Sequence, residues 1–198
     1  MHPNDSVTSG AATLSAKGMS RKSFLKLTLG VAVAAGVSPL LGGCSSPGRK
    51  LRFKTINDIL VELALIEANQ PVTMQQPWSL YKVLTHMAQS AEYSMTGYPE
   101  MDSAAKQALA KIAFNVFKSQ GYMSHDLGAV VPGAPEIADD GPLEEAMLRL
   151  RNALSDFQNF TGVLFPHFSY GDLTPEEWEL AHAFHGADHF SSLTYEIV

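Results

Sequence analysis

The stretch Thr174-Pro-Glu-Glu-Trp-Glu-Leu-Ala-His-Ala-Phe-His-Gly-Ala-Asp-His-Phe190 predicts a helix that carries unusual chemistry. Thr174 is a suitable N-cap, Pro175 suits the first helical position, and Glu177 completes a capping box. Three of the seven histidines in the chain follow at spacings of three and four residues. Their rings therefore project from one face of the helix: His182, His185 and His189.

Clustered imidazoles on one helix face indicate a metal site. Two imidazoles one turn apart can bind one transition metal, at ~2.0–2.1 Å per nitrogen for zinc, if another helix supplies a further ligand. The alternatives are buried histidines that hydrogen-bond to neighbouring helices, or a histidine-rich solvated edge. Three histidines within eight residues, beside Trp178, Phe184 and Phe190, favour the metal site.

The first 44 residues have the composition of a signal peptide. A basic segment, residues 20–26, precedes an uncharged apolar run of 15 residues, Leu27 to Leu41. This run is shorter than the ~18 residues expected of a transmembrane helix. Residues 20–26 resemble the twin-arginine export signal, with Lys22 in place of the second arginine, so the choice between export routes stays open. Met19 is an alternative start.

A lipoprotein cleavage site is expected at the end of this signal. Leu41-Gly42-Gly43-Cys44 resembles a lipobox, and Cys44 is the only cysteine in the chain. We therefore predict acylation of Cys44, attachment to the membrane through the acyl chains, and a location at the bacterial cell envelope on the periplasmic side. The alternative is a chance cysteine in a flexible tail.

Charge and cysteine content limit the partners. From Cys44 onward the chain has 19 acidic and 10 basic side chains, a formal charge of −9. A nucleic-acid partner is therefore not expected, because phosphate binding needs clustered lysines and arginines. Without a second cysteine there is no intrachain disulfide and no cysteine pair for zinc, so any metal ligands must be nitrogen or oxygen.

The rest of the chain predicts one all-α domain at 55–198, joined to the signal by a tether at 45–54. Helices are expected at about 55–69, 79–96, 101–120 and 142–163, before the helix that begins at Thr174. The predicted buried set of the third helix is Leu109, Ile112, Ala113, Val116 and Phe117. The predicted buried stripe of the fourth helix continues to Phe160.

A long loop rich in glycine and proline separates the third and fourth helices. Residues 121–141 form no predicted element, and loops of this length are often functional. The loop could fold over one end of the domain as a lid or wall. His125 and Asp126 lie in it, and we interpret them as a solvated pair.

His86, on the second predicted helix, completes a recognisable set with the last helix. Taken alone it is typical of a core histidine, but His86 followed by His185-x-x-x-His189 is similar to the metal triad of the DinB-like (YfiT-like) four-helix-bundle superfamily. Further motifs resemble one branch of it, a family of unknown function: Trp78-Ser79-Leu80, Gly97-Tyr98-Pro99, Pro132-Gly133-Ala134-Pro135, Pro166-His167-Phe168, Gly171-Asp172-Leu173-Thr174 and Glu177-Trp178.

The resemblance implies a bundle of up-down-down-up topology, with an extra helix and the long loop in the crossover. It implies a divalent metal held by His86, His185 and His189, and in some members reactions with low-molecular-weight thiols. Asp188 stands where the branch often has a further histidine, although a carboxylate can also orient a ligand ring. We expect His182, Asp188 and His167 beside the metal or in its pocket.

Two classes of function follow. Three protein ligands would leave a fourth position for water or substrate, as in catalytic zinc sites, which favours a metal-dependent hydrolase, transferase or isomerase acting on a small molecule. The alternative is a non-catalytic helical envelope lipoprotein that binds metal or a protein partner. Zinc, nickel and iron all accept imidazole. Glu92 and Tyr93 are candidate acid–base groups, and whether the domain forms a homodimer stays open.

Overall fold

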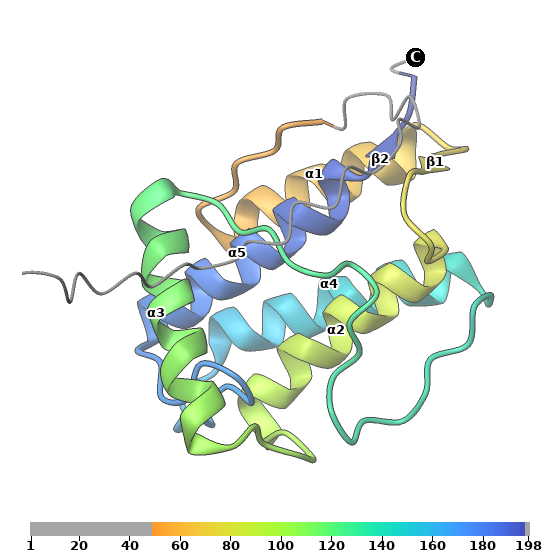
Figure 1. Cartoon of the computed structure of the whole chain (residues 1–198). Helices are drawn as coiled ribbons and strands as arrows, with labels where there is room; N and C mark the ends of the chain where they lie inside the picture. The colour runs from red at the N-terminus through yellow and green to blue at the C-terminus, as the bar shows by residue number, and fades with distance from the viewer. Residues whose placement is uncertain (1–48, 197–198) are drawn as a thin grey trace, which may run out of the picture. The chain divides into compact units, whose positions relative to one another are not determined.

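The computed structural model describes residues 49–196 of the chain (Figure 1). The predicted signal peptide at 1–44, the alternative start at Met19 and the predicted acylation site at Cys44 lie outside the described residues. Within 49–196, every helix is too short or too polar to cross a membrane.

The described part of the chain is mostly helical, as the sequence predicted. Two short strands form a small antiparallel sheet in which Thr73 is paired with Thr194, an element that the sequence did not predict. The elements in chain order are α1 (Ile56–Ala68), β1 (Thr73–Met74), α2 (Leu80–Thr96), α3 (Ala104–Gln120), α4 (Leu143–Asn159), α5 (Pro175–Ser191) and β2 (Leu193–Thr194).

Local sequence signals set most of the helix starts. Thr55 and Thr174 each cap a helix through a full capping box, and Ser79 accepts a hydrogen bond from the backbone N–H of Lys82. Such caps satisfy backbone N–H groups that have no partner within the helix. At the other end of α2, Gly97 has a φ of 94°, a conformation that favours glycine, and the chain turns away there.

Four of the helices pack around one apolar core. α2 lies mainly against α4 and α1 against α5, while α2 also contacts α5 and α1 contacts α4. The largest fully buried apolar side chains are Trp178, Phe114, Phe190, Ile56, Ile59, Leu63, Ile66, Leu84, Leu150, Leu154 and Leu193. Gly186 lets α5 lie close to α1 and α2 in this core, because a Cβ there would meet the side chains of Ile59 and Met87 at 3.1 Å.

α3 differs from its sequence prediction. Leu109, Ile112 and Val116 were expected in the core, but they are 70%, 63% and 53% exposed, and Phe114 is the one buried residue of the helix. The helix lies outside the four packed helices (Figure 1). The apolar stripe correctly predicted a helix. The prediction that this stripe is buried in the core was wrong.

Two boundaries also differ from expectation. α4 ends at Asn159, four residues before the predicted end, and Phe160 is 38% exposed. Within the predicted tether, residues 49–54 lie against the helical domain. Phe53 is buried, and Arg49 forms an ion pair with the buried carboxylate of Glu62, which also accepts a hydrogen bond from Tyr195.

Candidate metal centre

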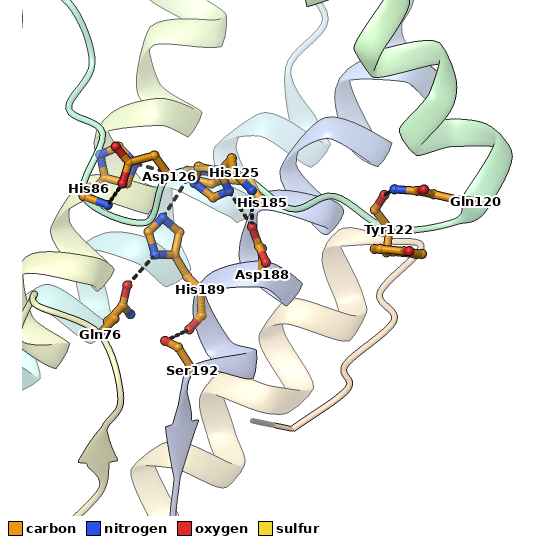
Figure 2. Close-up of polar contacts among 11 residues, drawn as sticks. Gln76, His86, Gln120, Tyr122, His125, Asp126, His185, Asp188, His189 and Ser192 are labelled. Atoms are coloured by element: carbon orange, nitrogen blue, oxygen red, sulfur yellow. Dashed lines mark hydrogen bonds and ion pairs between the residues drawn. The ribbon is translucent and has the colours of Figure 1, made fainter. Parts of the chain in front are cut away.

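Three imidazoles converge between α2 and α5, as the sequence predicted. Nε2 of His185 lies 3.1 Å from Nε2 of His86 and 3.1 Å from Nε2 of His189. One nitrogen from each ring lies within 4.8 Å of the other two, which is close enough for all three to hold one metal ion. Figure 2 shows the three rings, with His86 from α2 and the other two from successive turns of α5.

The spacing of these nitrogens fits a metal better than a set of ordinary hydrogen bonds. Two nitrogens that each lie ~2.0–2.1 Å from a tetrahedral zinc are separated by about 3.3 Å. Without a metal, Nε2 of His185 would have to serve two neighbours at once, although a neutral imidazole nitrogen either donates one proton or presents one lone pair. The donor set therefore suits the divalent metal that the resemblance implies.

The partner of His189 fixes which of its nitrogens carries the proton. Nδ1 of His189 lies 3.3 Å from Oε1 of Gln76, and an amide oxygen can only accept a hydrogen bond (Figure 2). Nδ1 therefore donates, and Nε2 presents its lone pair to the other two rings. A hydrogen bond of this kind is how proteins usually orient a histidine that binds a metal.

Burial keeps the three rings neutral, which is the form that binds a metal. Removal from water lowers the pKa of His86 to about 4, with a smaller contribution from the nearby ring of His125. Removal from water and the neighbouring imidazoles lower the pKa of His185 and His189 well below the usual value. Trp78 packs edge-on against His86, with ring centroids 5.1 Å apart.

A fourth imidazole, His125, lies beside the three, and this corrects the expectation that it is a solvated loop residue. Its Nδ1 donates to Oδ2 of Asp188 at 2.7 Å, and its backbone N–H donates to the same oxygen at 2.8 Å (Figure 2). Its ring centroid lies 5.1 Å from that of His185 and 5.0 Å from that of His189. Its Nε2 is buried with no hydrogen-bond partner.

Asp188 therefore holds the long loop against α5 by accepting two hydrogen bonds from His125. We expected it to orient a ring near the metal, and it does hold an imidazole, but the ring belongs to residues 121–141 and not to the predicted triad. Asp126, the neighbour of His125, is exposed and accepts a hydrogen bond from the backbone N–H of Gly128, as a solvated loop residue would. The length of the loop was the one signal in the sequence that pointed to His125.

A pocket of about 220 Å³ is lined by two of the three rings, His86 and His185, and by His125. The long loop forms part of its wall through Met123 and Val131. This confirms the expectation that the loop covers part of the domain. The remaining lining residues are Ser90, Asp126, Ala129, Val130, His167, Phe168, Ser169, Tyr170, Trp178, Ala181 and His182.

His182 and His167 both line this pocket, and neither belongs to the group of three. His182 lies between Trp178 and Phe157, with ring centroids at 5.2 Å and 4.8 Å, and burial lowers its pKa to about 4. Nδ1 of His167 accepts hydrogen bonds from the backbone N–H groups of Ser169 and Tyr170. Burial lowers the pKa of His167 to about 3.

The other two candidates from the sequence lie away from the pocket. Glu92 forms an ion pair with Arg149 on α4, at 2.7 Å between Oε2 and Nη2. The ring of Tyr93 packs against Tyr98 at 5.5 Å between centroids. Neither side chain lines the pocket.

Comparison with known proteins identifies the family. Residues 46–196 match the family described as "Protein of unknown function (DUF1569)", and the chain belongs to that family. No curated protein and no solved structure matches the chain. The functional argument therefore depends on the geometry of the site.

Proposed function

We propose that this protein is a divalent-metal-dependent enzyme of the DinB-like kind that acts on a small molecule. The observation that carries the proposal is the convergence of three imidazole nitrogens, with two of the rings lining a pocket. His86, His185 and His189 are the proposed ligands. Zinc, nickel and iron suit this donor set.

The proposed fold is an up-down-down-up four-helix bundle formed by α1, α2, α4 and α5. Hydrogen bonds between the N-terminal ends of paired helices support this topology. Ser79, the N-cap of α2, donates to the backbone oxygen of Asp139 just before α4, so α2 and α4 begin together. The backbone N–H of Ile56 donates to Glu179, so the starts of α1 and α5 lie close. The colours in Figure 1 agree with these directions.

The chemistry proposed for the site follows from the coordination position that three protein ligands would leave free. A divalent metal with three protein ligands can polarise a substrate oxygen or lower the pKa of a bound water or thiol. The residues of the chain would bind and orient the substrate. His125, held at Nδ1 by Asp188, keeps the lone pair of Nε2 free to accept a proton or a hydrogen bond at the edge of the pocket.

The pocket supports an enzyme over the non-catalytic alternative. A structural metal site is closed by four protein ligands. Within residues 49–196, the group close enough to hold a metal contains three, and the space next to it is a pocket and not packed side chains. A thiol-dependent transferase or isomerase reaction is the finer form of the proposal, and it rests on the resemblance.

We also propose that the protein is exported and held at the cell envelope by acylation of Cys44. The support is the sequence alone: a basic segment, an uncharged run and Leu41-Gly42-Gly43-Cys44. Mass spectrometry of the membrane fraction tests it. We expect a mature protein that begins at Cys44 and carries acyl mass, and a protein that begins upstream without acyl mass would contradict the proposal.

Metal analysis of the purified full chain tests the metal proposal. We expect about one equivalent of divalent metal in the wild type, and strong loss in His86→Ala, His185→Ala and His189→Ala. His182→Ala and His167→Ala are matched controls, because each removes a pocket imidazole outside the proposed set. Equal metal content in wild type and His185→Ala would overturn the proposal, as would loss of metal in His182→Ala with retention in His189→Ala.

A further inference from the structure

Positive charge is concentrated in residues 49–54, which belong to the predicted tether. This segment has four basic and no acidic side chains, whereas residues 55–196 have 6 basic and 19 acidic side chains. Within the described part of the chain, every lysine and arginine forms an ion pair with a carboxylate except three, all of them exposed in the tether: Lys50, Arg52 and Lys54. Unpaired cations beside an acidic domain indicate a partner that carries negative charge.

The outer face of α3 exposes a row of aliphatic side chains. Leu109, Ile112 and Val116 lie at spacings of three and four residues and are 70%, 63% and 53% exposed. The helix also contains three lysines and no acidic residue, so it has no negative charge of its own. An apolar helix face combined with lysines is typical of helices that lie on a lipid surface.

The tether and α3 meet at the C-terminal end of this helix. The guanidinium carbon of Arg52 lies 4.0 Å from the ring centroid of Tyr122, two residues beyond the end of α3, and Figure 1 shows the tether passing this end. The backbone N–H of Leu51 donates to Oγ of Ser191 at 3.2 Å, and Phe53 is buried. The tether therefore has a fixed place on the domain, next to α3.

The proposed acylation site is close in sequence to this fixed segment. Cys44 precedes Arg49 by five residues, and a chain extends at most ~3.6 Å per residue, so an acylated Cys44 would keep Arg49 within about 18 Å of the bilayer. A linker this short brings the tether side of the domain toward the lipid head groups. A second copy of the chain fits α3 less well, because a stable interface uses about 20–30 residues a side and this row has three.

We propose that the aliphatic row of α3 and the three unpaired cations of the tether form one surface that rests on an anionic lipid bilayer. The cations contact lipid phosphate groups, and the aliphatic side chains enter the boundary between head groups and acyl chains. The acidic remainder of the domain is repelled by the same bilayer, which orients the domain. The inference rests on the proposed function only in placing the domain at a membrane.

Vesicle binding of the mature chain, residues 44–198 with Cys44→Ser, tests the proposal. Residues 1–43 are left out because their apolar run would itself enter a bilayer, and the apolar core lies within residues 53–193. At about 0.1 M salt we expect at least tenfold tighter binding to phosphatidylcholine vesicles with about 30% phosphatidylglycerol than to phosphatidylcholine alone, and loss of this preference at about 0.5 M salt. Equal binding to the two kinds of vesicle, or binding to neither, would overturn the proposal.

Two triple variants separate the tether from the net charge. Each basic side chain near an anionic surface contributes roughly fivefold to binding, so binding to the anionic vesicles should weaken at least tenfold in Lys50→Gln/Arg52→Gln/Lys54→Gln. The matched control removes the same charge from ion pairs on α2 and α4 and should weaken binding less than about threefold: Lys82→Gln/Arg149→Gln/Arg151→Gln. Equal weakening would show that net charge, and not the tether, governs binding. Circular dichroism checks that each variant is folded.

Ile112→Glu tests the apolar part of the surface. The change places a charge in the aliphatic row, so binding to the anionic vesicles should weaken about tenfold. Leu148→Glu is the matched control, because Leu148 is 56% exposed on α4 and Ile112 is 63% exposed. Equal effects of the two substitutions would rule out contact between α3 and lipid.

A fluorophore at Val116→Cys distinguishes lipid from a second copy. In the Cys44→Ser chain this is the single thiol, and its emission should shift to the blue when anionic vesicles are added. A shift without lipid that grows with protein concentration, together with a dimer in sedimentation, would show that another copy covers α3 and would overturn the proposal.

The lipid-facing surface and the lipid anchor can fail separately. If the mature protein in cells carries no acyl mass while the chain prefers anionic vesicles through the tether and α3, the surface stands and the lipoprotein proposal is wrong. If Cys44 is acylated and the unacylated chain shows no preference for anionic vesicles, the anchor stands and this inference is wrong.

Discussion

α3 and α5 have the same length, 17 residues, and opposite environments. α5 buries nine residues, two of which are His182 and His189, whereas α3 buries only Phe114. Apolar side chains on α3 remain in water while polar rings on α5 are removed from it. Burial of an imidazole costs free energy that burial of a leucine does not, so the composition of α5 requires an explanation beyond packing. A metal centre with an adjoining pocket provides one.

The largest effect that the comparison predicts is on stability. Phe190 on α5 is fully buried, so Phe190→Ala should lower the free energy of unfolding by about 3–5 kcal/mol. Leu109→Ala on α3 should change it by less than about 0.5 kcal/mol, because Leu109 is 70% exposed. Urea denaturation of the metal-free protein measures both. Similar losses in the two variants would show that α3 is packed against something in solution.

The second prediction concerns pH and His182. The pKa of His182 is about 4 in the fold and ~6.5 in the unfolded chain, so between these values the unfolded state binds more protons. This contribution to stability is complete above about pH 6.5 and is lost as the pH falls toward 4. Its full size is on the order of 3 kcal/mol.

His182→Leu should therefore reduce the loss of stability between pH 7 and pH 4. The measurement is the free energy of unfolding of the metal-free protein at several pH values, for wild type and variant. The lowered pKa values of the other buried imidazoles, such as His167, leave a residual slope in the variant. An unchanged slope in His182→Leu would contradict the buried, neutral state of this ring.

The third prediction concerns the bond between the long loop and α5. Asp188→Ala removes the acceptor of both hydrogen bonds from His125, and bonds to a charged group contribute about 1.5–3 kcal/mol. We expect the backbone amide of His125 to exchange its hydrogen roughly thirtyfold faster, while amides of α4 stay protected. Asp126→Ala is the matched control, because the carboxylate of Asp126 accepts a hydrogen bond from Gly128 within the same loop. Equal effects would mean that the loop is not held through Asp188.

The smallest predicted effect is on the outer face of α3. Ile112→Glu places a charge at a position that is 63% exposed, so the free energy of unfolding should change by less than about 0.5 kcal/mol. Thermal unfolding of the variant and of wild type measures this difference. A loss of 2 kcal/mol or more would show that Ile112 is buried in the protein in solution.

Much of the fold could be predicted from local sequence signals. Thr174 marked the start of α5, because capping chemistry involves residues only two or three positions apart. The helices predicted from about 55 and 79 begin within one residue of those positions. The pairing of His185 with His189 followed from the geometry of one helix turn. The addition of His86 needed the family resemblance, since no local rule connects residues 99 positions apart.

The features that were missed depend on contacts between distant segments. A stripe such as Leu109, Ile112 and Val116 predicts a helix, but it does not say which surface the helix meets. His125 lies in a loop without periodicity, and its contact with Asp188 spans 63 positions. The buried carboxylate of Glu62 contacts Arg49 and Tyr195, which lie near the two ends of the described residues.

The central claim is that His86, His185 and His189 hold one divalent metal beside the pocket. A crystal structure of the full chain prepared with zinc, with anomalous diffraction measured at the zinc edge, tests it most directly. We predict one strong anomalous peak about 2.0–2.1 Å from the Nε2 atom of each of the three rings. A peak elsewhere, or no peak with the three rings hydrogen-bonded to one another, would contradict the claim.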